Sequence, residues 1–343
     1  MTAGTGKADV RLEELSAWTA ATLRTAAFTL APASADASFR RYFRITLEAP
    51  WHGHATLIVM DAPPPMEDCR PFVHVASLLA GAGLHPPEVL AGDSARGFLL
   101  LTDLGTRTYL EGLDAGSAPA LYGDATDALI RWQQATRDDA LPSYDEALLA
   151  RELALFPDWY VGKHLGRTLT PAQQQTLARA FRLILDSNLA QPRVFVHRDY
   201  HSRNLMLSPP NLGILDFQDA VVGPITYDLV SLLRDAYVAW DEEQQIDWAV
   251  RYWERARKVG LPVGDDFGAF WRDFEWMGAQ RQLKVLGIFA RLCHRDGKAA
   301  YLDDMPRVMR YLRGVCERYR ALGPLGTLID EIQSGAPPGA GRS

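Results

Sequence analysis

Apolar and polar residues follow two different periods along this chain, one up to residue 101 and another beyond residue 120. Helical spacing appears over 10–24 and again from Pro71 to near Gly81. Short β-type runs, the first with clear alternation, cover 39–47, 56–60, 89–91 and 98–101. Alternation predicts strands, whereas apolar residues three or four apart predict helices. The order strand, strand, helix, strand, strand is therefore predicted after the first helix.

Beyond residue 120 the helical period dominates. We expect helices over 124–136, 146–156, 171–188, 226–239, 242–259, 266–293 and 305–321. Thr170 followed by Pro171 is typical of a helix start. The pattern predicts an α+β protein with a β-rich lobe over 1–101 and a helical lobe over 106–333. The tail over 334–343, rich in Gly and Pro, is expected to be disordered.

Polar residues between short apolar runs near residue 200 carry the strongest chemical signal. His197-Arg198-Asp199 is followed after four residues by Asn204, and Asp216 follows the apolar run 213–215. Transfer of a phosphoryl group from ATP needs mainly positioned groups and neutralised charge. We predict that Asp199 accepts the proton of the attacking hydroxyl, and that Asn204 and Asp216 offer oxygen ligands to Mg²⁺. The alternative is that these side chains only cap turns and strand ends.

Composition limits the classes of protein that fit. The 343 residues, 48% of them hydrophobic, suffice for two lobes. A net charge of −6 argues against a nucleic-acid surface and against attraction to an anionic membrane. We see no apolar leader or membrane span, and the 3 cysteines suit a reducing compartment. We expect a cytoplasmic monomer without nucleic-acid or membrane partners.

The same motifs carry a resemblance to a known family. The blocks 196–204, 214–219 and 227–229 resemble the aminoglycoside phosphotransferase-like kinases of small hydroxylated molecules, which have a bilobal protein-kinase-like fold. The blocks 37–44, 59–64 and 280–292 are most similar to the bacterial anomeric kinases of N-acetylmuramate and N-acetylglucosamine. The resemblance implies that ATP and Mg²⁺ are used to make a sugar 1-phosphate in peptidoglycan recycling.

The resemblance also implies where the nucleotide binds. The segment 102–105 would be the hinge, with backbone groups of Thr102 and Leu104 holding adenine; an ordinary linker is the alternative. The family's usual lysine is absent: the strand that should carry it runs to Asp61 and contains no lysine. We expect the phosphates to meet other groups of the first hairpin, namely Ser38, Arg40, Arg41 and Arg44. The arginines fit a solvated strand face equally well.

An acceptor site for an amino sugar needs aromatic faces and hydrogen-bonding groups. We name His201 and Arg203 in the catalytic loop, Trp159, Arg281 and Lys284. Either of the last two cations suits the lactyl carboxylate of N-acetylmuramate, although each named residue also fits a core or surface role. Three rival functions stay open. An aminoglycoside or choline-type kinase requires an acidic acceptor pocket, a non-catalytic pseudokinase is suggested by the missing lysine, and a pure interaction protein would bind no nucleotide.

Overall fold

A computed structural model describes residues 9–34, 39–209 and 212–334. The chain forms two compact units. The first runs up to Thr106 and includes Gly213–Gln218, and the second comprises Arg107–Leu212 and the chain from Asp219 onward. Ser38, a predicted phosphate contact, lies outside the described residues. Within the described ranges, no helix has the length and apolar character needed to span a membrane.

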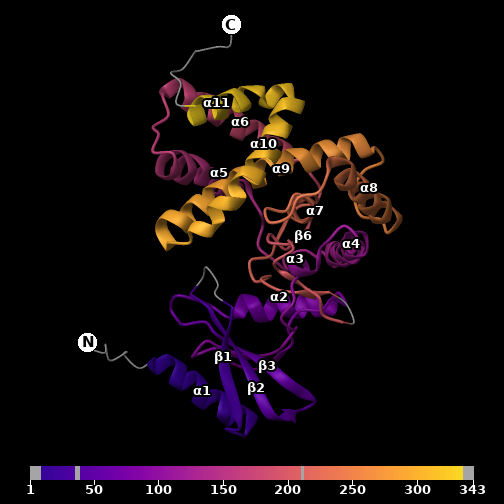
Figure 1. The fold of residues 1–343 in the computed structure, drawn as a ribbon. Helices are drawn as coiled ribbons and strands as arrows, with labels where there is room; N and C mark the ends of the chain where they lie inside the picture. Colours follow the sequence, from indigo (N-terminus) through magenta and orange to yellow (C-terminus); the bar gives the residue numbers. More distant parts are fainter. Residues whose placement is uncertain (1–8, 35–38, 210–211, 335–343) are drawn as a thin grey trace, which may run out of the picture. The chain divides into compact units, whose positions relative to one another are not determined.

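The first unit, drawn mainly in indigo and purple in Figure 1, is built on a five-stranded antiparallel sheet with strand order β1-β2-β3-β5-β4. Its strands are β1 (Phe28–Ser34), β2 (Arg41–Trp51), β3 (His54–Asp61), β4 (Val89–Asp93) and β5 (Phe98–Thr102), and its helices are α1 (Val10–Leu23) and α2 (Arg70–Gly81). The short strand β8 (Gly213–Ile214) also belongs to this unit. The predicted strands and helices of this region are confirmed.

The core of this unit follows from the alternation in β2. Phe43, Ile45 and Leu47 are buried on one face of the strand, and Phe43 lies opposite Val59 of β3. Trp18 of α1 packs into the same cluster. Each large side chain buried in this way contributes about 1.5–3 kcal/mol to stability. The period-two pattern thus fixes which face of the sheet is covered by α1.

Strand β1 was not among the predicted strands. It pairs with β2 at the edge of the sheet, and Phe28 and Leu30 are only partly buried. Pro32 interrupts its pattern, and the register shifts between Pro32 and Ser34. Proline is tolerated on edge strands because its missing N–H faces away from the neighbouring strand. The weak sequence signal reflects this edge position.

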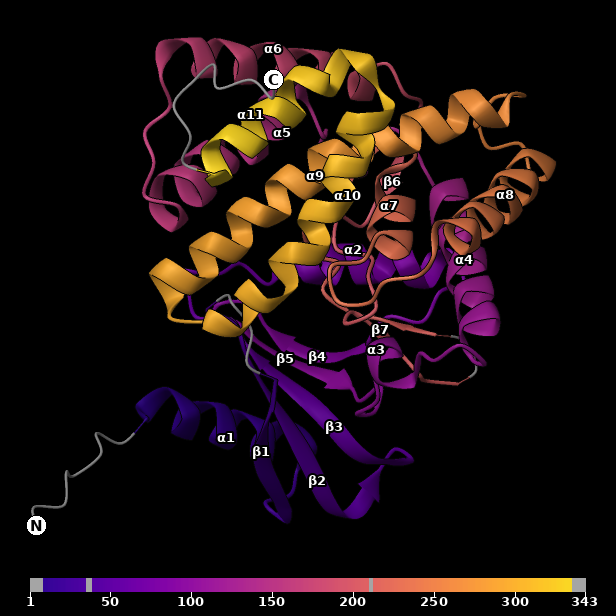
Figure 2. The ribbon, with the colours of Figure 1, turned by 45° about the horizontal axis from the view of Figure 1, so that its top comes forward.

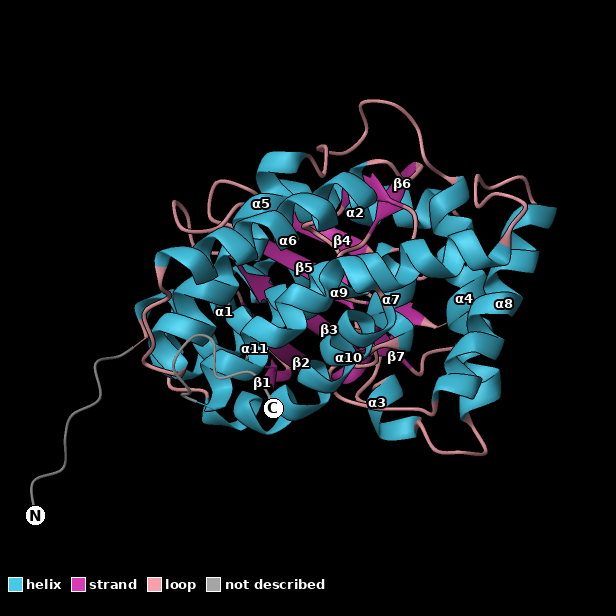
Figure 3. Ribbon diagram, turned by 90° about the horizontal axis from the view of Figure 1, so that it is seen from above, coloured by secondary structure: helices cyan, strands magenta, loops and turns pink. Residues whose placement is uncertain are grey.

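The second unit is mainly helical, as Figure 3 shows by colour. Its α-helices are α3 (Tyr109–Gly112), α4 (Ala118–Gln134), α5 (Glu146–Leu155), α6 (Pro171–Leu189), α7 (Tyr227–Leu233), α8 (Glu242–Lys258), α9 (Phe267–Asp296), α10 (Met305–Arg318) and α11 (Gly323–Ser334). A π-helix, η1 (Phe156–His164), continues α5, and short 3₁₀ turns cover Ala299–Asp304 and Arg320–Leu322. The strands are β6 (Arg193–Val196), β7 (Leu205–Met206) and β9 (Val221–Pro224), and β6 pairs with β9 antiparallel.

The predicted helices are present, although α4 begins at Ala118 and not at residue 124, and α7 is shorter than predicted. Helix α6 begins where Thr170 predicted it, with a capping box between Thr170 and Gln173. Helix α7 ends at Leu233, so our prediction of a helix to residue 239 was wrong. The reason is tertiary, because Asp235 accepts a hydrogen bond from the N–H of Ser202 in a turn outside the helix. Helix α11 was not predicted.

Helix α9 organises the second unit. Its 30 residues contact η1, α5, α6, α7 and α10, and Figure 2 shows α10 lying along it. A Cβ atom added at Gly287 would meet the backbone of Leu155 at 2.4 Å, so α9 and the end of α5 are held at a distance that only glycine allows. Several polar and charged residues of α9 are also buried. Charged side chains are rarely buried unless they are paired.

Candidate active site

The catalytic loop 197–204 leaves strand β6 and is braced by a buried carboxylate. Asp228, near the start of α7, accepts hydrogen bonds from the backbone N–H of His197 at 2.6 Å and of Arg198 at 3.0 Å. Arg198 has a φ of 78°, a conformation that costs a non-glycine residue about 1–3 kcal/mol. Burial raises the pKa of the Asp228 carboxyl to about 7. Asp228 thus braces the catalytic loop and is not the N-cap of α7, because Thr226 holds that position.

Asp199 and Asn204 are fixed relative to one another. The Asn204 side-chain Nδ2 donates to the carbonyl oxygen of Asp199 at 2.9 Å, and the N–H of Asp199 donates to Nδ1 of His197 at 3.2 Å. This hydrogen bond uses the Nδ2 of Asn204 and fixes the orientation of its side-chain amide. His197 is buried and also packs edge-on against Tyr200. His197 therefore has a structural role behind the catalytic loop.

A buried ion-pair network holds the residue before Asp199. Arg198 Nη2 lies 2.5 Å from Oε1 of Glu152 in α5, and Lys284 Nζ of α9 lies 3.0 Å from the same oxygen. Lys284 also donates to the Tyr227 hydroxyl at 2.9 Å, and the Tyr144 hydroxyl donates to Glu152. Burial alone would raise the pKa of Glu152, but the positive charge of Lys284 and that of Arg198 outweigh it and lower that pKa. Glu152 was missed in the sequence, where nothing links it to Arg198.

The charges around Asp199 keep its carboxyl ionised. Burial would raise the pKa of Asp199, but the nearby charge of Lys284 opposes this most strongly. The charges of His201, Arg198 and Arg281 act in the same direction, and the net effect is a pKa below the usual value. The group predicted to be the base is therefore in the form that accepts a proton, within a positive local field.

The far end of the loop is fastened by Asp235. Its Oδ2 accepts from the N–H of Ser202 at 2.8 Å. Arg203 is exposed, and its guanidinium lies 3.6 Å from the ring centre of Tyr237. His201 packs edge-on against the same ring, and burial lowers the pKa of His201. His201 and Arg203 thus share an aromatic platform beside Asp199, and their contact with substrate stays a prediction.

The other three predicted substrate residues lie in different surroundings. Trp159 is half-buried in η1, and its role stays a prediction. Lys284 is committed to Glu152 and Tyr227. Arg281 is buried on α9 and acts on Asp199 only through its charge.

Asp216, the second predicted magnesium ligand, belongs to the first unit. Its φ is 59°, a strained value for a residue with a side chain, and such strain gathers at functional sites. Its Oδ1 accepts from the side-chain Nε2 of Gln218 at 2.8 Å. Both predicted ligands present oxygen, the donor that Mg²⁺ prefers. Among the described residues no three His, Cys, Asp or Glu side chains gather as a metal site, and the predicted pair, one amide and one carboxylate, does not require such a group.

The predicted hinge segment continues from the end of β5 at Thr102 without regular secondary structure. The Asp103 carboxylate accepts from the N–H of Gly105 at 3.0 Å. The N–H of Thr102 donates to the carbonyl oxygen of Glu88 at 3.0 Å, so this N–H is already used within the first unit. Leu104 is buried. The adenine contacts stay predictions.

The first-hairpin arginines already have carboxylate partners. Arg44 binds Asp103 with two nitrogens, at 2.7 and 3.0 Å. Arg41 binds Asp61, the residue at the end of the strand that lacks lysine. Arg40 lies 3.9 Å from Glu67. Phosphate would have to compete with these partners, so the structure gives the predicted phosphate contacts no support and does not test them.

Comparison with known proteins identifies the family. The sequence pattern of the phosphotransferase enzyme family matches residues 29–271. The chain belongs to this phosphotransferase family. An N-acetylmuramate/N-acetylglucosamine kinase of Pseudomonas putida is 51% identical to this chain over 339 residues. The match covers 96% of this chain and 98% of that protein. A protein of the same name from Pseudomonas aeruginosa is 55% identical over 311 residues, covering 90% and 89%.

Solved structures agree with the fold of this phosphotransferase. The ADP-bound aminoglycoside phosphotransferase APH(2'')-Ib has a TM-score of 0.58 at 14% identity, covering 87% of this chain and 97% of that chain. A choline/ethanolamine kinase family protein from Mesorhizobium loti has a TM-score of 0.62 at 18% identity, covering 92% and 99%. At these identities the likeness concerns the fold alone.

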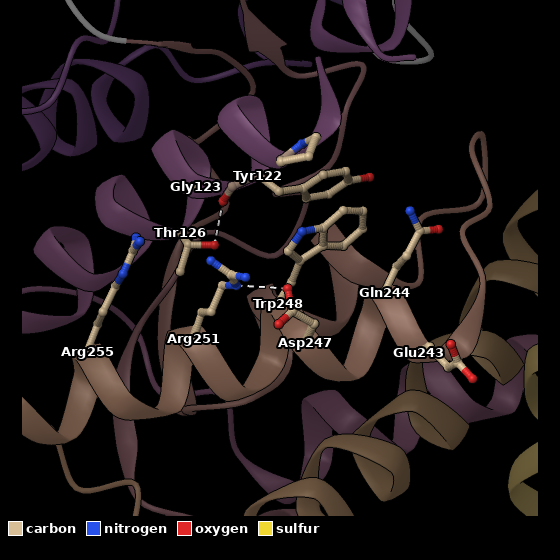
Figure 4. Close-up of a pocket in the computed structure, with 10 residues that line it drawn as sticks. Tyr122, Gly123, Thr126, Glu243, Gln244, Asp247, Trp248, Arg251 and Arg255 are labelled. Atoms are coloured by element: carbon tan, nitrogen blue, oxygen red, sulfur yellow. Dashed lines mark hydrogen bonds and ion pairs between the residues drawn. The ribbon is translucent and has the colours of Figure 1, made fainter. Parts of the chain in front are cut away.

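A cavity of about 370 Å³ in the second unit lies between α4 and α8 (Figure 4). Tyr122 and Trp248 stack at its wall with ring centres 4.3 Å apart, and Arg251 pairs with Asp247 at its rim. It contains none of the predicted catalytic or substrate residues of the phosphotransferase. The candidate active site therefore rests on the catalytic loop and not on this cavity.

Proposed function

We propose that the protein transfers the γ-phosphoryl group of ATP to the anomeric hydroxyl of N-acetylmuramate or N-acetylglucosamine. The observation that carries the proposal is the identity of 51% over 96% of the chain to a relative with that name. The product would be the sugar 1-phosphate, and peptidoglycan recycling in the cytoplasm is the process that fits it. The geometry of the catalytic loop supports the chemistry of this proposal.

In the proposed step, Asp199 accepts the proton of the anomeric hydroxyl while the hydroxyl oxygen bonds to the γ-phosphorus. The bond from that phosphorus to the β,γ-bridging oxygen breaks, and ADP leaves. Asp199 then releases the proton to solvent. Its role is mainly to orient the hydroxyl, because phosphoryl transfer depends chiefly on positioning and charge neutralisation.

Magnesium, when bound, would neutralise charge on the phosphates. Asn204 and Asp216 are the proposed ligands. Two local observations support them: the fixed orientation of the Asn204 amide and the strained backbone of Asp216. The assignment rests on the sequence motif and on these local features of each residue.

The charges near Asp199 favour this acceptor over a cationic one. Lys284, Arg198 and Arg281 each lower the pKa of Asp199, so a positive field from these three residues acts at the Asp199 carboxyl. The same field would repel the ammonium groups of choline or an aminoglycoside. A neutral or anionic sugar meets no such repulsion.

The test is phosphorus NMR of the products formed from ATP and a panel of acceptors. N-acetylmuramate and N-acetylglucosamine should each give a phosphate coupled to the anomeric proton. The methyl glycoside of N-acetylglucosamine, whose anomeric oxygen is blocked, should give none. Phosphorylation of this glycoside, or of choline or an aminoglycoside in place of the sugars, would disprove the proposal.

The base is tested separately with Asp199→Asn. We expect kcat to fall about 10²–10⁴-fold, because general-base assistance has that size, while the affinity for ATP is unchanged. Asp186→Asn, which removes an exposed carboxylate of α6, is the matched control and should keep full activity. ATP consumption by the wild type with either sugar also excludes a pseudokinase.

A further inference from the structure

Arg281 is a buried cation whose side chain is left partly unpaired. Only 3% of the residue is exposed, and its Nη1 has no hydrogen-bond partner among the described residues. Lys284, three positions further along α9, shows the contrast, because it is paired with Glu152 and Tyr227. A charge held out of water without a partner is costly. A bound anion would remove this cost.

The charge of Arg281 acts on the catalytic centre. It contributes to the low pKa of Asp199 and also acts on His201 and Asp228. His201 adds a second observation, since its buried Nδ1 has no partner in the described part of the chain either. Two nitrogen atoms without partners therefore belong to residues that interact electrostatically with Asp199.

Two anionic groups in the proposed reaction could pair with Arg281, the lactyl carboxylate and the transferred phosphoryl group. The two sugar substrates differ in whether they contain the carboxylate. The lactyl carboxylate exists in N-acetylmuramate but not in N-acetylglucosamine. If Arg281 served that carboxylate, N-acetylglucosamine would leave the guanidinium buried and unpaired, and a site left so rejects a substrate strongly. The relatives are named for both sugars. The transferred phosphoryl group is the anion common to both reactions.

We propose that Arg281 binds the phosphoryl group during its transfer to the sugar and in the sugar 1-phosphate product. The inference rests on the proposed function. As the γ-phosphorus moves from the bridging oxygen of ATP to the anomeric oxygen, its equatorial oxygens carry the negative charge. Arg281 donates hydrogen bonds to them and supplies positive charge in a protein that lacks the usual strand lysine. A guanidinium suits phosphate because it offers parallel donors.

The experiment compares Arg281→Gln with Arg272→Gln, which removes an exposed arginine from the same helix. We expect Arg281→Gln to lower kcat about 10²–10³-fold, the usual effect of losing one donor to a transition-state oxyanion. The loss should be equal for both sugars, with little change in their KM. The affinity for N-acetylglucosamine 1-phosphate, measured by calorimetry, should fall at least tenfold. Arg272→Gln should match the wild type in all these values.

Misfolding is separated from this effect by chemical rescue. Guanidinium ion added to Arg281→Ala should restore part of kcat, which it would not do for a purely structural residue. A loss of kcat/KM at least tenfold larger for N-acetylmuramate than for N-acetylglucosamine would overturn the proposal in favour of carboxylate recognition. Unchanged kcat in a folded Arg281→Gln would overturn it outright.

The activity of the wild type distinguishes failure of the proposed function from failure of the role proposed for Arg281. If the wild type phosphorylates neither sugar, that function falls. The wild type can still be assayed for slow hydrolysis of ATP, in which water replaces the sugar as the acceptor of the γ-phosphoryl group at the same site. Arg281→Gln should lower this hydrolysis relative to Arg272→Gln, and equal rates would again reject the role of Arg281.

Discussion

Replacement of Lys284 by methionine tests whether the buried network supports the catalytic loop. The Lys284 Nζ lies 3.0 Å from Glu152, and both side chains are 7% exposed. Breaking a buried pair by removing one partner costs about 3–5 kcal/mol, because an uncompensated charge remains. Glu152 keeps Arg198 and Tyr144 as partners. We therefore expect Lys284→Met to lower the free energy of unfolding by about 3 kcal/mol, at the low end of that range.

A double-mutant cycle isolates the pair. Glu152→Gln and Lys284→Met are measured singly and together by urea unfolding, followed by tryptophan fluorescence. Contacting charges couple by about 0.5–3 kcal/mol, and we expect about 2 kcal/mol here because both groups are buried. The double variant should thus be more stable than the sum of the single losses predicts. Additivity within about 0.3 kcal/mol, the behaviour of distant sites, would refute the network.

The same variant should change the pH dependence of activity. Burial raises the pKa of Asp199, and Lys284 is the strongest of the charges that lower it. Without Lys284 this pKa rises, so the acidic limb of the kcat/KM profile moves to higher pH. Lys258→Met, at the exposed end of α8, is the control. An unmoved limb in a folded Lys284→Met would contradict the electrostatic argument.

Three further predictions follow from buried positions. The pKa of Asp228 rises from 3.8 in the unfolded chain to about 7 on folding, so its stabilising contribution is full below pH 3.8 and is lost as pH rises through about 7. The wild type should therefore lose stability relative to Asp228→Asn between about pH 4 and 7, by at most about 1.4 kcal/mol per pH unit, and parallel unfolding curves would disprove this. Gly287→Ala should lower stability by about 1–3 kcal/mol in urea unfolding, because the new methyl meets the backbone of Leu155, and a neutral effect would show that α9 shifts freely. Cys316 is buried and burial raises its pKa to about 12, so iodoacetamide should label it only after unfolding, and labelling of the native protein would contradict this burial.

Local patterns account for much of the fold. The alternation of Phe43, Ile45 and Leu47 predicted the buried face of β2, and Thr170 predicted the start of α6. Such signals are local, because a strand face or a helix cap depends on residues a few positions apart. Where neighbours distant in sequence decide, prediction was wrong or silent. Helix α7 ends early because Asp235 turns to the catalytic loop, and β1 carries only the weak pattern of an edge strand.

The sequence by itself determined the chemistry. The spacing of Asp199, Asn204 and Asp216 predicted a phosphotransferase, because phosphoryl transfer needs a carboxylate at the attacking hydroxyl and oxygen ligands for Mg²⁺. The tertiary structure decided which charged residues lie near Asp199 and lower its pKa. Arg198 and Lys284 come from the catalytic loop and a distant helix, and they meet at Glu152 of α5 only after folding. A buried charge is stabilised by whatever lies beside it in space, and no pattern along the chain records that neighbour.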